Sequence, residues 1–138
     1  EVIDSINMDI QKHHAVLNFG KLPKVRGDKN GLKRVFSCLI LNGIKFNKSA
    51  RPEVHIHTSK EDNKIRIGIQ DNGIGIDETY YEQVFQMYKR LHNRSEYTGS
   101  GIGLTISKRI IEAHKSEIEL TSELEKGSTF SFLLEEAS

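Results

Sequence analysis

The sequence predicts an α+β fold: a two-layer sandwich in which a mixed sheet of about five strands is covered on one face by about three helices. Two observations lead to this prediction. Helical and strand-like segments occur in blocks along the chain, and most of the strand-like segments form consecutive pairs joined by short turns. The chain has 138 residues, which suits one core, so residues 1–138 are expected to form a single domain.

The helices are predicted from apolar residues at helical spacing. Residues 1–12 form the first such segment, and the second extends from about Asn30 to Phe46, with Asp28 as its N-cap. A short helix is expected to begin near Asp77, and the last helix is expected over Ile102–His114. The second helix has the clearest apolar stripe, which consists of Leu32, Val35, Phe36, Leu39, Ile40 and Gly43.

The strands are predicted from short segments in which apolar and polar residues alternate. A first hairpin is expected to turn at Glu61-Asp62-Asn63, and a second at Glu125-Lys126-Gly127. Residues 21–28 contain a proline and are expected to form an exposed connection. The expected strands are Ala15–Phe19, Val54–Ser59, the stretch around Ile65–Ile69, Glu117–Glu123 and Ser128–Glu135.

The composition is that of a soluble globular domain, with 36% apolar and 28% charged residues. Twenty basic and nineteen acidic residues give a net charge of +1, which argues against a nucleic-acid-binding surface or a polybasic membrane anchor. The apolar runs are too short to insert into a bilayer, and the single cysteine, Cys38, suits the cytoplasm. The chain begins at Glu1 without a methionine, so we expect it to be a segment of a longer protein.

Two glycine-rich stretches are the most informative feature of the chain. In Tyr97–Leu104 three glycines stand at alternate positions and lead directly into the last predicted helix. Such a segment lets the backbone approach a polyphosphate closely and offers it the positive end of a helix dipole. The second stretch, Asp71–Ile76, follows a predicted strand. Because no G-x-x-x-x-G-K-[ST] sequence occurs, these stretches, with Asn42, Lys45 and Phe46, indicate an ATP site that is not a P-loop.

The second predicted helix carries a polar strip of Cys38, Asn42 and Lys45 beside its apolar stripe. For this helix taken alone, a solvated surface is the favoured explanation. Beside the glycine-rich stretches, the Asn42 oxygen is a suitable neutral ligand for Mg²⁺, Lys45 could meet a phosphate, and Phe46 could pack on adenine or belong to the core. Asp71 could accept a hydrogen bond from an exocyclic amine such as that of adenine, or it could simply begin a turn.

Other polar groups allow more than one interpretation. The segment 89–98 leads into the glycine run, so it is either a solvated loop or a mobile ATP lid. His55 and His57 share a strand face, but no carboxylate or cysteine set completes a metal site with them. Cys38 lies in an amphipathic helix and is expected to be inert. The basic residues of the lid segment are Lys89, Arg90, His92 and Arg94.

Five stretches occur in a characteristic order: Leu39–Phe46, Asp71–Ile76, Phe85–Tyr88, Gly99–Leu104 and Gly127–Phe130. They resemble the N box, first glycine box, F box, second glycine box and terminal G-x-T-F element of the catalytic and ATP-binding domain of sensor histidine kinases. This family lies within the superfamily that includes DNA gyrase, MutL and the heat-shock chaperone ATPase. The resemblance covers about Leu22 to Leu133, and Tyr88–Tyr97 is especially similar to kinases of the phytochrome and PAS-sensor type.

The resemblance implies a role for each matched residue. Asn42 would bind Mg²⁺, and Lys45 and Arg90 would contact phosphate, which makes these three the catalytic set. Asp71 would read the adenine amine, and Thr129 would close the pocket behind the adenine. The other nucleotide-binding residues would be Phe46, Gly73, Gly75 and Ile76 at the base, and Gly99, Ser100, Gly101, Ile102, Gly103 and Leu104 at the phosphates.

The chain departs from the family pattern at three positions. Cys38 stands where the family usually has Asn and related ATPases have a catalytic Glu. Gly43 replaces a common Ala, which costs helix propensity. Lys115 and Ser116 replace a Gly-Gly pair, so Lys115 is expected to adopt a left-handed conformation at the end of the last helix. No histidine has the sequence context of a phosphoacceptor. The resemblance therefore implies that the dimerisation and phosphoacceptor domain lies before Glu1.

The sequence therefore predicts the catalytic domain of a two-component sensor kinase. It would be a protein-histidine kinase that transfers the γ-phosphoryl of Mg-ATP to a histidine in a separate dimerisation and phosphoacceptor domain. A response regulator receiver domain would be the second partner, and the isolated domain would be a cytoplasmic monomer. Two alternatives stay open: a degenerate regulatory module that binds nucleotide or a partner, and an ATPase of the same superfamily. The ATPase is disfavoured because Cys38 cannot activate water as a Glu could.

Overall fold

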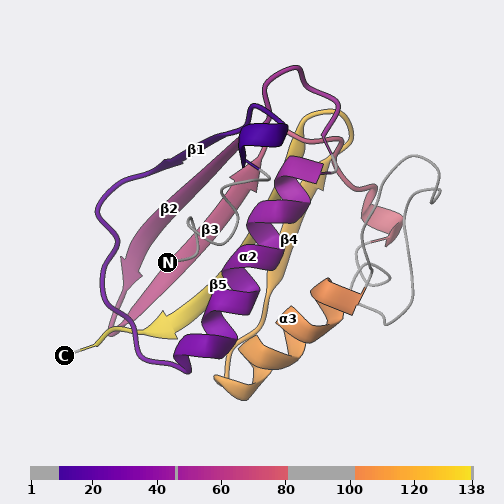
Figure 1. Cartoon of the computed structure of the whole chain (residues 1–138). Helices are drawn as coiled ribbons and strands as arrows, with labels where there is room; N and C mark the ends of the chain where they lie inside the picture. The colour runs from indigo at the N-terminus through magenta and orange to yellow at the C-terminus, as the bar shows by residue number, and fades with distance from the viewer. Residues whose placement is uncertain (1–9, 46, 81–101, 138) are drawn as a thin grey trace.

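The computed structural model describes residues 10–45, 47–80 and 102–137, and within them it forms a two-layer α+β sandwich. One layer is a five-stranded sheet with the order β1-β2-β3-β5-β4, in which β1 and β2 are parallel and the other neighbours antiparallel. The helices α2 (Lys29–Lys45) and α3 (Ile102–Ala113) cover the same face of this sheet (Figure 1). The predicted fold class is confirmed. The strands are β1 (Val16–Phe19), β2 (Glu53–Glu61), β3 (Lys64–Asp71), β4 (Glu119–Glu123) and β5 (Gly127–Glu135).

Helix α2 begins one residue before the predicted position. The backbone N–H of Gly31 donates to Asp28 Oδ2 at 2.8 Å, so the predicted N-cap is confirmed. The helix is described to Lys45, and Phe46 lies outside the described residues. Its apolar stripe faces the sheet, since Val35 and Leu39 are almost completely buried.

Both predicted hairpins are present. In the first, Glu61 pairs with Lys64, so Asp62 and Asn63 form a two-residue turn, and Asp62 has a positive φ of 56°. In the second, β4 and β5 are antiparallel, and their pairing extends from Glu119 with Ser131 to Glu123 with Gly127. Alternation then places one side of each strand against the helices, because side chains of successive residues point to opposite faces.

The core lies between the sheet and the two helices. Its central side chain is Phe132, which is fully buried and meets Phe36 of α2 edge to face, with ring centroids 5.9 Å apart. The alternating isoleucines of β3 are buried on the same face, as the sequence predicts. The other buried core residues include Leu39, Ile40, Ile44, Val54, Ile111, Phe130 and Leu134.

Helix α3 ends in the predicted left-handed residue. Lys115 has a φ of 61°, its N–H donates to Glu112 O at 2.9 Å, and the N–H of Ser116 donates to Ile111 O at 3.2 Å. These two bonds form a Schellman motif, and the prediction for Lys115 is confirmed. His114, just before it, accepts the Asp28 N–H at Nε2 at 2.9 Å, which joins the end of α3 to the start of α2.

Some predicted elements fall partly outside the described residues. Of the first predicted helix, residues 10–12 are helical and the rest lies outside. A 3₁₀ turn, η1 (Glu78–Tyr80), follows Asp77, whose side chain accepts the Thr79 N–H at 2.9 Å, and the remainder of that predicted helix lies outside. In the described part of the chain, no helix has the length and apolar character needed to cross a membrane.

Candidate functional site

Three segments that carry predicted site residues meet at one edge of the sandwich. These are the C-terminal end of α2, the loop after β3, and the turn between β4 and β5, all at the upper edge in Figure 1. Asp71, the last residue of β3, lies at their centre. The strand-end position that the sequence indicates for this carboxylate is therefore also the place where the α2 and β5 segments converge.

The Asp71 carboxylate is half-buried and held by backbone donors. Its Oδ1 atom accepts the N–H of Gly73 at 2.8 Å and the N–H of Ser128 at 3.2 Å. Burial raises the pKa of the Asp71 carboxyl, and the two backbone hydrogen bonds oppose this rise. Because both donors reach Oδ1, the described contacts leave Oδ2 able to accept a further hydrogen bond.

Gly43 of α2 lies directly against Asp71. A Cβ at Gly43 would be 2.7 Å from Asp71 Cβ, a distance that real side chains do not tolerate, and it would also make a tight contact of 3.1 Å with Val54 Cγ2. Considered within the helix alone, Gly43 only lowers helix propensity. The structure supplies a reason for the glycine, since its missing side chain lets α2 approach the end of β3.

Two glycines near the site have a positive φ, a conformation that glycine adopts easily and other residues do not. Gly75 has a φ of 77°, and a Cβ there would overlap the Glu123 carbonyl oxygen. Gly127 has a φ of 123°, and a Cβ there would overlap the Asp71 carbonyl oxygen. These positions therefore require glycine for the packing of backbone on backbone.

Serine side chains anchor the loop after β3 to the second hairpin. Ser122 Oγ accepts the Ile76 N–H at 2.7 Å and donates to the Gly127 carbonyl at 2.8 Å. The hydroxyls of Ser122 and Ser128 lie 2.7 Å apart. Ser122 thus anchors the first glycine stretch, and the sequence does not indicate this because Ile76 and Ser122 are 46 residues apart.

The register of β5 places Ser128 and Thr129 on opposite faces of the sheet. Thr129 pairs with Gln70 and Thr121, so its side chain lies on the face of the sheet opposite to Asp71. Ser128 lies on the same face as Asp71, is 7% exposed, and donates its N–H to the carboxylate. Ser128 is therefore the β5 residue beside the carboxylate, and the role of Thr129 behind the adenine stays a prediction.

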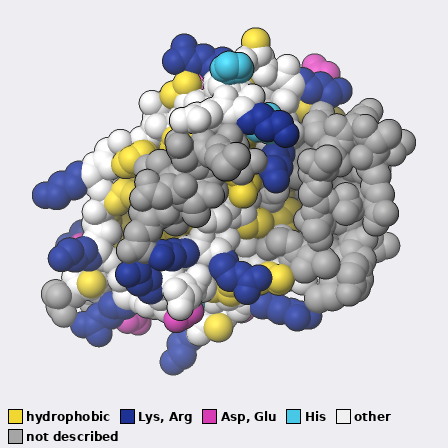
Figure 2. Space-filling view, in the orientation of Figure 1, with side chains coloured by type: hydrophobic (Ala, Val, Ile, Leu, Met, Phe, Trp, Pro, Cys, Tyr) yellow, Lys and Arg dark blue, Asp and Glu magenta, His cyan; other side chains and the backbone are white. Residues whose placement is uncertain are grey.

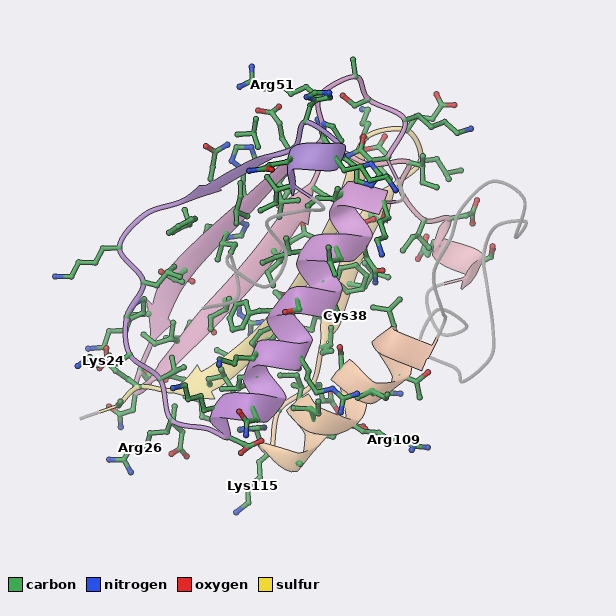
Figure 3. The ribbon with its side chains drawn as sticks, viewed as in Figure 1. Lys24, Arg26, Cys38, Arg51, Arg109 and Lys115 are labelled. Carbon is green, nitrogen blue, oxygen red and sulfur yellow. The ribbon has the colours of Figure 1, made fainter. Side chains whose placement is uncertain are left out.

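The polar strip of α2 is not a simple solvated surface. The side-chain nitrogen of Asn42 donates to Cys38 Sγ over 3.7 Å, a distance normal for sulfur, and the Cys38 thiol is also hydrogen-bonded to Ser107 of α3. Burial raises the pKa of the Cys38 thiol. Figure 3 shows Cys38 on the side of α2 that faces α3.

The remaining predicted residues are partly outside the described chain. Lys45 is half-buried at the end of α2, and Ile76 and Leu104 are half-buried against the core. For Ile102 and Gly103 only their place at the start of α3 is described. Phe46, Arg90, Gly99, Ser100, Gly101 and the F-box stretch Phe85–Tyr88 lie outside the described residues.

The histidines of β2 lie on the open face of the sheet. Both His55 and His57 are exposed, and the His57 ring occupies the space above Gly68 on the neighbouring strand. Among the described residues, no group of three His, Cys, Asp or Glu side chains could hold a metal ion. Lysine and arginine side chains are spread over the described helix-bearing face in Figure 2.

With this geometry established, the family is clear. The chain matches the model of the histidine kinase-, DNA gyrase B-, and HSP90-like ATPase family over residues 27–138, and it belongs to that family.

Among curated proteins, the chain is similar to phytochrome-like protein Cph1 of Synechocystis, with 40% identity over 136 residues, covering 96% of this chain and 18% of Cph1. It is also similar to the autoinducer 2 sensor kinase/phosphatase LuxQ of Vibrio vulnificus, with 40% identity over 109 residues, covering 75% of this chain and 13% of LuxQ. The chain therefore spans less than a fifth of the length of these relatives.

Two solved structures share the fold. Full-length ShkA in complex with AMPPNP superposes with a TM-score of 0.81 at 20% identity, covering 99% of this chain and 29% of ShkA. The mycobacterial sensor histidine kinase MprB gives a TM-score of 0.81 at 23% identity, covering 98% of this chain and 93% of the solved one. At these identities, the likeness establishes the shared fold.

Proposed function

We propose that this chain is the ATP-binding catalytic domain of a two-component sensor histidine kinase. It would transfer the γ-phosphoryl of Mg-ATP to a histidine of a separate dimerisation and phosphoacceptor domain. The observation that carries the proposal is the Asp71 carboxylate, which is held by Gly73 and Ser128 and approached by Gly43, in a chain of this ATPase family.

Recognition of adenine would use the second oxygen of Asp71. Two backbone N–H groups fix Oδ1, so the carboxylate is already oriented before a ligand arrives. Oδ2 would accept a hydrogen bond from the exocyclic amine of the base. A charge-assisted bond of this kind in a half-buried position contributes about 1–3 kcal/mol. A purine that carries a carbonyl oxygen at this position would instead face the carboxylate with a second acceptor.

The residues present fit a magnesium ion that is held mainly by the nucleotide. The Asn42 nitrogen is engaged by Cys38, so the neutral oxygen of the same amide is the group available as a ligand. Mg²⁺ keeps several waters and usually takes one or two protein oxygens with substrate phosphates, which agrees with the lack of a described three-residue metal cluster. When bound, Mg²⁺ would neutralise charge that develops on the phosphates.

The other roles follow from position. Lys45, one turn beyond Asn42 on α2, would contact a phosphate, and Arg90 would do so from the lid. Gly99–Leu104 would cradle the phosphates at the start of α3, where the helix dipole favours negative charge. Ser128, whose N–H holds the Asp71 carboxylate, would line the adenine side, and Thr129 remains the residue proposed to close the pocket behind the adenine. Phosphoryl transfer depends mainly on such positioning and on charge neutralisation, so the domain needs no covalent intermediate.

One observation disfavours the ATPase alternative. Burial raises the pKa of Cys38, which keeps its side chain a neutral thiol at physiological pH. A neutral thiol is a weak hydrogen-bonding group and cannot serve as the general base that a Glu would provide. The similarity to LuxQ, whose name is that of a sensor kinase/phosphatase, also disfavours a degenerate module.

The partners and the compartment are part of the proposal. Because the chain spans less than a fifth of relatives such as Cph1, the phosphoacceptor domain would lie elsewhere in the same protein. A response regulator receiver domain would then accept the phosphoryl group. We place these reactions in the cytoplasm, where ATP is supplied.

Calorimetric titration of the chain with Mg·ATP tests the binding step. We expect saturable binding of ATP and ADP, weaker binding of GTP, and loss of this preference in Asp71→Asn.

Transfer is tested by adding γ-labelled ATP together with the phosphoacceptor region of the parent protein. Absence of nucleotide binding by the folded wild-type chain would refute the proposal. Nucleotide binding without transfer to the phosphoacceptor region would show that the chain is a regulatory module without kinase activity.

A further inference from the structure

The side chains of Ser107, Cys38 and Asn42 form a hydrogen-bonded chain between α3 and α2. Of these three, the proposed function gives a direct role only to Asn42. Ser107 of α3 is 1% exposed and is hydrogen-bonded to the Cys38 thiol. Cys38 Sγ in turn accepts from Asn42 Nδ2 at 3.7 Å. Buried polar groups are normally paired, and here the pairing extends from the helix–helix contact to the predicted magnesium ligand.

The orientation of a carboxamide follows from the partner of either end. Its oxygen and its nitrogen point in diverging directions, so a donor bond from the nitrogen fixes the direction of the oxygen. In Asn42 the nitrogen faces Cys38, and the oxygen is therefore directed away from the α2–α3 contact. A free carboxamide can rotate by half a turn and present its nitrogen to a cation, which is unfavourable.

We infer that Cys38, supported by Ser107, is a positioning residue that orients the Asn42 amide with its oxygen toward Mg²⁺. This inference rests on the proposed function, since it concerns the same site. The Cys38 thiol has acceptor capacity for the Asn42 N–H, although it is too weak a ligand for a hard cation. Its contribution is thus exerted on Asn42 and not on the metal ion directly.

The test compares three chains: wild type, Cys38→Ala and Cys38→Ser. The Ala variant removes the acceptor, whereas the Ser variant keeps one on a smaller side chain. ATP affinity is measured by calorimetry with Mg²⁺ and with EDTA, and the Mg²⁺-dependent gain is the ratio of the two. We expect the gain to fall about fivefold in Cys38→Ala and to return to within about twofold of wild type in Cys38→Ser, in line with one hydrogen bond. Affinity in EDTA should stay unchanged.

A second measurement does not require nucleotide. The side-chain amide protons of Asn42 are followed by NMR in the nucleotide-free chain, with Asn42→Ala used for assignment. We expect Cys38→Ala to shift these signals toward those of a free amide and to speed their exchange with water, and Cys38→Ser to retain slow exchange.

The outcomes separate this inference from the proposed function. If wild type does not bind Mg·ATP, the proposed function and this inference both fall. If wild type binds and Cys38→Ala keeps the full Mg²⁺-dependent gain, only the inference is overturned. It is also overturned if both variants lose the gain in proportion to their loss of thermal stability, since Cys38 would then act through packing, or if the Asn42 signals do not change in Cys38→Ala.

Discussion

The side-chain nitrogen of Asn47 lies 2.7 Å from the side-chain oxygen of Asn72 and also donates to the Gly43 carbonyl at 3.0 Å. The same Asn72 oxygen accepts the Glu53 N–H at 2.8 Å. The two amides therefore join the end of α2, the start of β2 and the loop after β3. Because Asn72 immediately follows Asp71, this connection determines how the carboxylate sits relative to α2.

Replacing Asn72 with Ala should destabilise the domain. Two donors, from Asn47 and from the Glu53 backbone, would lose their acceptor, and each unsatisfied buried group costs about 1–3 kcal/mol. Partial access of water to this site places the expected loss near the lower end. Urea unfolding measures it. Asn72→Asp is the matched control because it keeps the accepting oxygen. Equal losses in the two variants would show that the acceptor is not what matters.

Replacing Asp71 with Asn should change binding and stability in opposite directions. The amide keeps an oxygen for the Gly73 and Ser128 N–H groups but loses the charge-assisted bond to adenine, worth about 1–3 kcal/mol. ATP affinity should therefore fall about 5- to 150-fold, while binding of other purines changes less. Calorimetry with ATP and GTP measures this difference. Unchanged ATP affinity would contradict the assigned role.

The stability of the nucleotide-free domain should depend on the ionisation of Asp71. Burial raises its pKa above the ordinary value of 3.8, so the folded state binds the proton more tightly than the unfolded state. The free energy of unfolding should then decrease as pH rises from 3.8 through the raised folded value. In Asp71→Asn this decrease should disappear, and the variant should be more stable than wild type at neutral pH. Parallel pH profiles for the two proteins would show that Asp71 is not responsible.

Replacing Lys115 with Gly should stabilise the domain by about 1 kcal/mol. Lys115 has a φ of 61°, where a side chain is disfavoured and glycine is not. Its side chain is exposed at the end of α3 (Figure 3), so its removal should not disturb the core. Thermal or urea unfolding measures the change. Lys115→Ala, which keeps a Cβ, should give no such gain, and an equal gain there would point to the charge instead.

Replacing Gly75 with Ala should unfold the loop after β3. The new Cβ would overlap the Glu123 carbonyl, and φ is 77°, so both packing and backbone conformation are violated. We expect a loss of about 2–4 kcal/mol and loss of ATP binding. Gly20→Ala is the control, since a Cβ at Gly20 has no described atom within 4 Å. Wild-type stability of Gly75→Ala would mean that the β4–β5 turn moves easily.

The chain should bind ATP without phosphorylating itself. None of its six histidines lies in the sequence context of a phosphoacceptor helix. Incubation with γ-labelled ATP should leave the chain unlabelled, and label should appear on the phosphoacceptor region of the parent when that is added. Acid-labile label on the chain alone would show that one of its own histidines is an acceptor.

The fold could be predicted from sequence because its signals are local. The alternating isoleucines of β3, the Asp28 cap and the turn at Asp62 each depend on neighbouring residues. The left-handed Lys115 was predicted in a different way, from the Gly-Gly pair that the resembling family has at this position.

The details of the site depend on contacts between distant segments. The sequence indicates Asp71 as a strand-end carboxylate, but it does not indicate Ser128 as its partner, because only the register of β5 decides which residue lies beside Asp71. Similarly, Gly43 was judged by helix propensity alone, while its reason is the approach of Asp71. The Asn47–Asn72 bond had no recognisable pattern, since polar residues after a helix are common.

The place of β5 in the sheet determines when, during synthesis of the chain, the domain can first recognise a nucleotide. Of the described strands β5 is the last to be synthesised, yet it lies between β3 and β4, and it brings the Ser128 N–H to a carboxylate encoded 57 residues earlier. A nascent or truncated chain that ends before Gly127 would contain Asp71 and its glycines but would lack one of the two donors that hold the carboxylate. Nucleotide recognition should thus arise only after β5 has been synthesised and has paired with β3, so that chains ending earlier do not compete for ATP.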